Sequence, residues 1–241
     1  VLFNHGTENN HIGVPQTLLK LKRSHDVVIV EMGTNRFGDI PWLTEVARPT
    51  IAILTNIGAS HLAFLKTPKD VFLEKSALVN GLARGGLVIV NRDDRYLREI
   101  PRRDRKHNVV TCGINTPATF RATDIQRDRK GRLLFRVNQR QRFILSSPAR
   151  TNIYNALVAI SCGRVFKLSY NTIRKRLSRA KGCRGRQQIQ HYGGLTVIDD
   201  TYNANPLSFS SALETLSRLP ARGRRILVCG DMLELGQEGP A

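Results

Sequence analysis

The sequence predicts an α/β protein made of two units, residues 1–183 and 184–241. Short β-branched runs alternate with helical segments in both units, and this alternation is typical of βαβ connections. The runs are apolar at nearly every position, as in parallel strands that helices cover on both faces. Near residue 119 the pattern changes to short segments separated by polar turns, which indicates a small antiparallel patch within the first unit.

The first part of the chain is expected to alternate strands with helices. One helix fits between Asp39, which can open it, and Pro49, which follows its end. A longer helix fits between Pro68, which suits a first turn, and Gly85, which suits a helix end. Such close succession of strand and helix favours right-handed crossovers and a mostly parallel sheet. The expected strands are 27–32, 51–57, 87–91 and 109–113, and the expected helices are 40–47 and 68–84.

The rest of the chain holds the antiparallel patch, two helices and the second unit. A glycine-containing basic stretch at 182–186 is typical of a linker. Beyond it, strand, helix and strand patterns return, which predicts a second βαβ arrangement. The patch is expected at 119–125, 133–137 and 142–145, the helices at 152–165 and 171–180, and the second unit's elements at 195–198, 206–219 and 226–229.

The formal net charge of +19 is unusual for 241 residues. Such an excess is compatible with a noncatalytic basic module that binds nucleic acid. However, the Arg-rich stretch 92–142 also contains several carboxylates, and it lacks the regular aromatic spacing of a base-stacking platform. We therefore expect no nucleic-acid partner, and we interpret the charge as a solvated basic face that favours an anionic substrate.

The sequence predicts a cytoplasmic protein. Its four cysteines are far apart and form no Cys-x-x-Cys pair, which favours reduced structural thiols. No apolar run reaches the eighteen or so residues that a membrane helix needs. The first residues, Val1 to Phe3, show neither an initiator Met nor a secretory leader, and we expect that both ends of the sequence are cut from a longer protein.

Two polar residues follow expected strands that should be neighbours in the sheet. Glu31 closes the run that starts at Val27, and His61 follows the run that starts at Ile51. Ligands of open parallel sheets gather beyond the carboxyl ends of the strands, so this pair could hold Mg²⁺, although His is an unusual ligand for so hard a cation. The alternative is a strand-end carboxylate bound by backbone and a histidine in a loop.

Five further residues also allow both a functional and a structural interpretation. Asp199 and Asp200 end a strand, where they can bind a ribose or a metal, or only close the strand while Asn205 caps the following helix. The pair Asn152 and Asn155, three residues apart near a helix start, can read an adenine edge or serve as caps. Lys75, within the helix 68–84, is either a functional amine or a solvated lysine. None of these residues identifies an enzyme alone.

Together, however, these segments resemble the motifs of the Mur ligase family in the family's own order. The resemblance covers nearly the whole chain, and several independent motifs in sequence are far more specific than any one of them. The forms at 202–206 and 230–236 point to the branch that adds D-alanyl-D-alanine. The matching segments are Asn9-Asn10-His11-Ile12-Gly13, Glu31-Met32-Gly33, Asn56-Ile57-Gly58 with His61-Leu62, Asn152-Ile153-Tyr154-Asn155, Gly185-Arg186, Tyr202-Asn203-Ala204-Asn205-Pro206 and Gly230-Asp231-Met232-Leu233-Glu234-Leu235-Gly236.

The resemblance implies an ATP-dependent peptide ligase of cell-wall synthesis that uses ATP and Mg²⁺. Its substrates would be UDP-N-acetylmuramoyl-tripeptide and D-alanyl-D-alanine, and the intact enzyme would be a monomer. The second unit would be the start of a Rossmann-like domain. The implied roles are Mg²⁺ binding by Glu31, His61 and a carbamylated Lys75, nucleotide binding by Asn152, Asn155, Arg186 and Asp200, catalysis by Lys75 and Arg186, and substrate contacts by Asn9, Asn10, Asn203 and Asn205.

We expect two parts of the family pattern that activity requires to lie outside this sequence. The family's Gly-rich phosphate loop is expected upstream of Val1, as is the domain that holds the UDP moiety. We therefore expect these 241 residues alone to be inactive. Besides the nucleic-acid module, a related amide ligase with another acceptor remains an alternative, because most acceptor contacts are expected outside this sequence.

Overall fold

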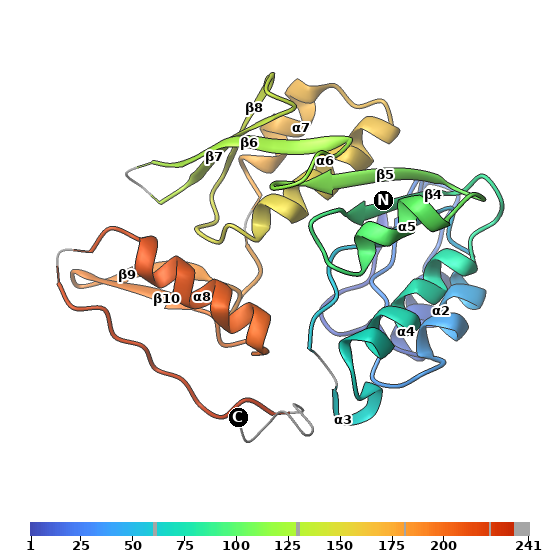
Figure 1. Cartoon of the computed structure of the whole chain (residues 1–241), viewed down its shortest axis with the longest axis horizontal. Coiled ribbons are helices and arrows are strands. Elements are labelled where there is room, and N and C mark those ends of the chain that lie inside the picture. The colour runs from blue at the N-terminus through green and yellow to red at the C-terminus, as the bar shows by residue number, and fades with distance from the viewer. Residues whose placement is uncertain (60–61, 129–130, 181, 222, 234–241) are drawn as a thin grey trace.

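A computed structural model describes residues 1–59, 62–128, 131–180, 182–221 and 223–233 of the chain (Figure 1). Six strands form the central sheet in the order β3-β4-β5-β6-β7-β8, while β1 pairs with β2 and β9 with β10. The strands are β1 (Leu2–Phe3), β2 (Val28–Ile29), β3 (Ile51–Leu54), β4 (Leu87–Asn91), β5 (Asn108–Gly113), β6 (Phe120–Arg127), β7 (Leu133–Val137), β8 (Gln141–Leu145), β9 (Gln188–Tyr192) and β10 (Leu195–Asp199). The helices are α1 (Gly13–Leu19), α2 (Asp39–Ala47), α3 (Leu62–Leu65), α4 (Pro68–Asn80), η1 (Leu97–Glu99), α5 (Ile100–Arg103), α6 (Asn152–Val165), α7 (Tyr170–Leu177) and α8 (Pro206–Arg218).

The central sheet confirms the predicted mixture of parallel and antiparallel strands. Strands β3 to β6 pair in parallel, and β6, β7 and β8 pair antiparallel. Alternate residues of β3 enter different cores: Ala52 and Leu54 pack with α4, whereas Ile51 and Ile53 pack on the side of α6. Helices thus cover both faces of the parallel part, which is why its strands are apolar at successive positions. None of the described helices is long and apolar enough to cross a membrane.

Local sequence accounts for several element boundaries. Helix α4 begins with a capping box between Thr67 and Asp70, and Pro68 follows the cap. The helix ends at Asn80 and not at residue 84, because Gly81 takes the C-cap and packs against α2. A Cβ atom at Gly81 would lie 2.3 Å from Cγ2 of Thr44. Close packing of the two helices therefore requires glycine at this position.

The structure corrects three expectations. The strand expected at 27–32 is limited to β2, which pairs with β1 over two residues. The strand expected at 226–229 is absent from the described residues 223–233, where Ile226 and Val228 are exposed. An isolated strand has no ladder partners for its backbone groups, so an apolar run alone does not form one. Finally, the unpredicted β9 pairs antiparallel with β10, so the second unit opens with a hairpin instead of a βαβ unit.

One carboxylate joins three elements at the carboxyl end of the sheet. Asp93 follows β4, and its side chain accepts backbone N–H bonds from Ile114, Asn115 and Thr116 at 2.6–2.9 Å. The hydroxyls of Thr116 and of Tyr154, on α6, also donate to it, at 2.6 and 2.8 Å. Burial alone would raise the pKa of Asp93, but these hydrogen bonds to its charged form outweigh burial and lower it.

Because its pKa is lower in the folded than in the unfolded chain, Asp93 contributes stability at neutral pH that is lost as pH falls below about 3.8 through the folded pKa. We expect Asp93→Asn to lower the free energy of unfolding by roughly 2–3 kcal/mol at pH 7, since an amide leaves some of the five donors unsatisfied. Urea denaturation at pH 7 measures this, with the exposed Asp26→Asn as the control. Equal midpoints for the two variants would contradict the assigned role.

Candidate functional site

One predicted residue, Lys75, lies near the segments that follow β3 and β4, where the unpredicted Asp94 connects them. Asp94, directly after Asp93, accepts N–H bonds from Ile57 at 2.7 Å and from Tyr96 and Leu97 at 2.9 Å. These bonds hold the segment that leaves β3 against the segment that leaves β4. The same carboxylate acts electrostatically on Lys75 of α4. Lys75 therefore lies close to the carboxyl end of the sheet, where ligands of such folds bind.

Lys75 and its neighbour Glu74 have different surroundings on α4. Burial lowers the pKa of the half-buried Lys75, and the Asp94 carboxylate opposes only part of that shift. Glu74 is 3% exposed and accepts N–H bonds from Gly38 at 3.0 Å and Ile40 at 2.7 Å. Its charge thus binds the N-terminal end of α2, where backbone N–H groups lack helical partners. Glu74 is held by the fold, whereas Lys75 is an amine with increased access to its neutral form.

Glu31 lies just beyond β2 and is exposed. Its Oε1 accepts a hydrogen bond from the side chain of Asn9 at 3.1 Å. Its backbone N–H donates to Oδ1 of Asn4, and its backbone carbonyl accepts from Nδ2 of the same side chain. The structure therefore brings Asn9 and Glu31 together. Asn10 has a structural function, because its Oδ1 accepts the N–H groups of Ile12 and Gly13 at the start of α1. Asn4 was missed by sequence reasoning, since nothing local indicates its partner 27 residues away.

The proposed metal set is only partly visible. His61 lies outside the described residues, so the structure does not test whether it approaches Glu31 or Lys75. Within the described ranges, no three His, Cys, Asp or Glu side chains are grouped as a metal centre. Met32, which follows Glu31, packs in the same apolar cluster as Ala77 of α4. The elements that carry Glu31 and Lys75 are therefore adjacent through this cluster.

A second group of predicted residues lines one cavity of about 600 Å³ between the two units. Asn152 and Asn155, from the first turn of α6, form one wall, and Arg186 forms part of another. Asn155 donates its amide to Oδ1 of Asn152 at 2.9 Å, and Asn152 donates to Ser147 at 2.5 Å. The side-chain oxygen of Asn155, Oδ1, accepts no hydrogen bond from the described residues. The cavity is within the size range of small-molecule sites.

Arg186 and Asp200 lie together beside this cavity. The guanidinium of Arg186 stacks over the ring of Tyr202, with 4.2 Å between Cζ and the ring centroid. Asp200 accepts the N–H of Gln187 at 3.2 Å. Burial raises the pKa of Asp200, and the hydrogen bonds from Gln187 and the charge of Arg186 offset part of this effect. A cation on an aromatic platform beside a half-buried carboxylate suits contacts with phosphate and ribose.

Gln187 is a residue that sequence reasoning missed. Its side chain donates to Ser211 at 3.4 Å and accepts from Thr215 at 2.7 Å, both on α8. The hydroxyl of Ser211 also lies 3.3 Å from that of Thr151, the residue before α6. Gln187 is buried and has a positive φ of 50°. This polar cluster joins the linker, α6 and α8, and no local motif indicates its partners.

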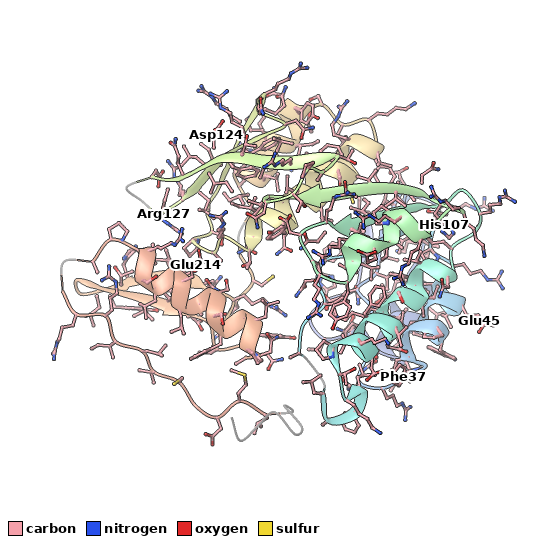
Figure 2. All side chains as sticks on the ribbon, viewed as in Figure 1. Phe37, Glu45, His107, Asp124, Arg127 and Glu214 are labelled. Carbon is pink, nitrogen blue, oxygen red and sulfur yellow. The ribbon has the colours of Figure 1, made fainter. Side chains whose placement is uncertain are left out.

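Further contacts hold the second unit against the first. A Cβ at Gly58, in the segment after β3, would lie 3.5 Å from Cδ2 of Leu207 on α8, and one at Gly131 would lie 3.1 Å from Leu219. Figure 2 shows Arg127 of β6 facing Glu214 of α8 across the boundary, and their charges interact. The cavity thus lies between units that are in contact.

The remaining predicted positions, Asn203 and Asn205, lie between β10 and α8. Oδ1 of Asn205 accepts the N–H of Ser208 at 2.9 Å and caps α8, with Ser208 completing the capping box. Asn203 is exposed, and its Oδ1 accepts the N–H of Ala204 at 2.8 Å. Both side-chain oxygens therefore serve the local backbone.

Comparisons with known proteins identify both units of the chain. Residues 2–163 match the Mur ligase middle domain, and residues 185–241 match the Mur ligase, glutamate ligase domain. Two similar proteins are the UDP-N-acetylmuramoyl-tripeptide--D-alanyl-D-alanine ligases of Bacillus subtilis, 32% identical over 96% of this chain, and of Escherichia coli, 33% identical over all of it. The alignments cover 50% and 54% of those proteins, so the chain spans about half the length of the curated relatives it matches.

Solved structures show the same similarity. MurF from Acinetobacter baumannii superposes with a TM-score of 0.89 at 29% identity, covering 99% of this chain and 52% of that one. MurF ligase from Thermotoga maritima, solved in complex with ADP, gives a TM-score of 0.87 at 25% identity, covering 98% of this chain and 55% of that one. With its sheet, its motif order and both of its units matched, this chain belongs to the Mur ligase family.

Proposed function

We propose that the intact protein joins D-alanyl-D-alanine to UDP-N-acetylmuramoyl-tripeptide at the expense of ATP, in the cytoplasm and as a monomer. The observation that carries this proposal is the shared cavity, which Asn152 and Asn155 line from the first unit and Arg186 from the start of the second. The names of the relatives support the reaction. The division into residues 1–183, as the ATP-binding domain, and 184–241, as the start of the ligase domain, belongs to the same proposal.

The nucleotide would occupy this cavity through a few polar contacts. The side-chain Oδ1 of Asn155 would accept a hydrogen bond from the adenine amino group. Asn152 would hold the Asn155 side chain in position through the hydrogen bond between them. Arg186 would contact the phosphates from its place on Tyr202, and Asp200 would accept from a ribose hydroxyl. This arrangement gives specificity from polar groups and requires both units, because the asparagines and the arginine lie on different units.

The residues near the sheet end suit a hard cation. Glu31 provides an exposed carboxylate, and carbamylation of Lys75 would replace an ammonium with an anionic oxygen ligand. The lowered pKa of Lys75 supports this, because only the neutral amine reacts with CO₂. Glu31, the carbamate of Lys75 and His61 would hold Mg²⁺. When bound, the metal would supply charge neutralisation of the phosphate oxygens.

The proposed reaction has two steps. The terminal carboxylate of the tripeptide attacks the γ-phosphorus of ATP, which forms an acyl phosphate and releases ADP. The amine of D-alanyl-D-alanine then attacks the acyl carbon, forming the amide as inorganic phosphate leaves and the amine loses a proton. Arg186 would stabilise charge on the transferred phosphoryl group. Asn9 would orient Glu31, and Asn10, Asn203 and Asn205 would shape the substrate-binding loops through their backbone bonds.

The acceptor assignment is tested with the purified intact enzyme. We expect phosphate release to require UDP-N-acetylmuramoyl-tripeptide, ATP and D-alanyl-D-alanine together, because the acyl phosphate persists until an amine attacks it. Single amino acids at equal concentration should support less than about a tenth of the rate, since a missing residue leaves binding groups unpaired. A faster rate with a single amino acid would favour the ligase with another acceptor.

Asn155→Ala should raise the KM for ATP by about 3- to 10-fold with a smaller change in kcat, because it removes one hydrogen bond to a nonreacting group. Discrimination between ATP and GTP should fall as well. Steady-state kinetics with both nucleotides measure this, and Asn171→Ala, at an exposed position of α7, is the control. Unchanged nucleotide discrimination in Asn155→Ala would remove it from the adenine site.

Lys75→Ala should lower kcat by at least about 100-fold, because a metal ligand is lost. Short carboxylates such as formate should restore part of the activity by occupying the vacated position, and they should not rescue the bulkier, cationic Lys75→Arg. The matched control is Lys69→Ala, at an exposed position of the same helix. The carbamate role is refuted by a fully active Lys75→Ala enzyme, or by a wild-type rate that is indifferent to removing bicarbonate.

A further inference from the structure

The positive charge of the chain is concentrated where local carboxylates are missing. Between Asp128 and Asp199 the sequence contains no aspartate or glutamate, although lysines and arginines recur throughout. Helices α6 and α7 lie within this stretch; α6 packs against β4, β5 and β6, and α7 packs against α6 and against β8 at the edge of the sheet (Figure 1). The basic side chains of these helices therefore lack acidic partners within their own region.

Helix α7 separates apolar from basic residues. Ile173 is 5% exposed and packs in the core below the helix. Lys175 and Arg176 are exposed on α7 together with Thr172, at spacings of three and four residues, and the exposed Arg179 follows two residues after the helix ends at Leu177. This exposed face is unlike a solvated one with mixed charges, because all of its charged groups have the same sign.

An apolar tip lies at the start of this face, where α6 ends. Val165, Phe166 and Leu168 are 40%, 47% and 46% exposed. The N–H of Leu168 bonds to the carbonyl of Gly163 at 2.9 Å and that of Lys167 to the carbonyl of Arg164 at 3.0 Å, which is a Schellman motif. Lys167 takes the left-handed position, with φ at 58°, where glycine is usual. A lysine is thus held in this tip at a conformational cost.

Arg164 fixes the tip in place. It donates to the carbonyl of Leu168 at 2.6 Å, and its guanidinium stacks over Tyr170, with 4.8 Å between Cζ and the ring centroid. The apolar tip (Val165, Phe166 and Leu168) is therefore bordered by a cationic rim (Arg164, Lys167, Lys175, Arg176 and Arg179). Arg164 and Lys167 belong to the same turn as the tip, and Lys175 follows about 8 Å along α7 from Tyr170.

We propose that this surface binds the protein peripherally to a bilayer that contains anionic phospholipids. The apolar tip inserts at the level of the headgroups, and the cationic rim contacts the phosphates around it. Nucleic acid fits less well, because Val165 and Leu168 neither stack on bases nor form hydrogen bonds with them. Each lysine or arginine near an anionic surface strengthens binding by about fivefold.

Membrane binding here is compatible with an accessible nucleotide cavity. Asn152 and Asn155 line the cavity at the first turn of α6, whereas the apolar tip follows the last turn. A helix of 14 residues separates the two by about 20 Å. The proposal thus concerns a different surface and does not depend on the proposed ligase activity.

The test is co-sedimentation of the intact protein with vesicles of phosphatidylglycerol and phosphatidylcholine, compared with pure phosphatidylcholine, at 0.1 M salt. We expect binding to the anionic vesicles alone. The variant Lys175→Gln/Arg176→Gln/Arg179→Gln should bind roughly 100-fold more weakly, and Phe166→Ser about tenfold more weakly. The matched control is Arg103→Gln/Arg105→Gln/Lys106→Gln, which removes the same charge from exposed positions near Asp104 and should keep most binding.

Three outcomes would overturn the proposal. The first is no binding of the intact protein to anionic vesicles, as when another part of the protein covers this surface. The second is an equal loss in the two triple variants, which shows only an effect of net charge. The third is tight binding of an oligonucleotide that the Lys175→Gln/Arg176→Gln/Arg179→Gln variant loses, together with a Phe166→Ser variant that binds oligonucleotide and vesicles as the wild type does. That combination indicates a nucleic-acid surface. Circular dichroism of each variant confirms that folding is intact.

Discussion

The carboxylate of Asp93 is the interaction on which the rest of the site depends. Parallel strands normally need a connection of a dozen or more residues, yet β5 and β6 pair in parallel across only six intervening residues. They overlap by two residues, and the short loop between them turns its backbone N–H groups toward Asp93. Since Tyr154 binds the same carboxylate, the position of α6, and of its two asparagines, is set from the end of β4.

The second constraint is the polar cluster of Gln187, Ser211 and Thr215. All three are buried, and the Gln187 amide is hydrogen-bonded through both its oxygen and its nitrogen. A buried network of this kind specifies one arrangement, because breaking any bond leaves a desolvated partner at a cost of about 1–3 kcal/mol. Ser211 extends the network to Thr151 at α6, so it aligns the two walls of the cavity.

Glu74 and Lys75, adjacent on α4, show how surroundings give two charged side chains different chemistry. The carboxylate of Glu74 is buried but bound by the start of α2, and so it remains a structural anchor. Burial disfavours the charged form of the Lys75 amine, and the nearby Asp94 carboxylate offsets only part of this effect, so the pKa of Lys75 is lowered. The basic side chains of α7 differ from both of these residues, because they remain solvated and are available to an external anion.

The sequence by itself determined the elements whose period is regular, and β4, β7 and α6 have the predicted bounds because apolar spacing alone selects their core faces. Motif order likewise predicted the family and located Asn152, Asn155 and Arg186, which the structure brings to one cavity. Only the tertiary structure decided that 226–229 forms no strand, that Asn4 binds the backbone of Glu31, and that Gln187 joins the two units. These outcomes depend on hydrogen-bond partners distant in sequence or on the presence of a strand to pair with, and neither is encoded in a local pattern.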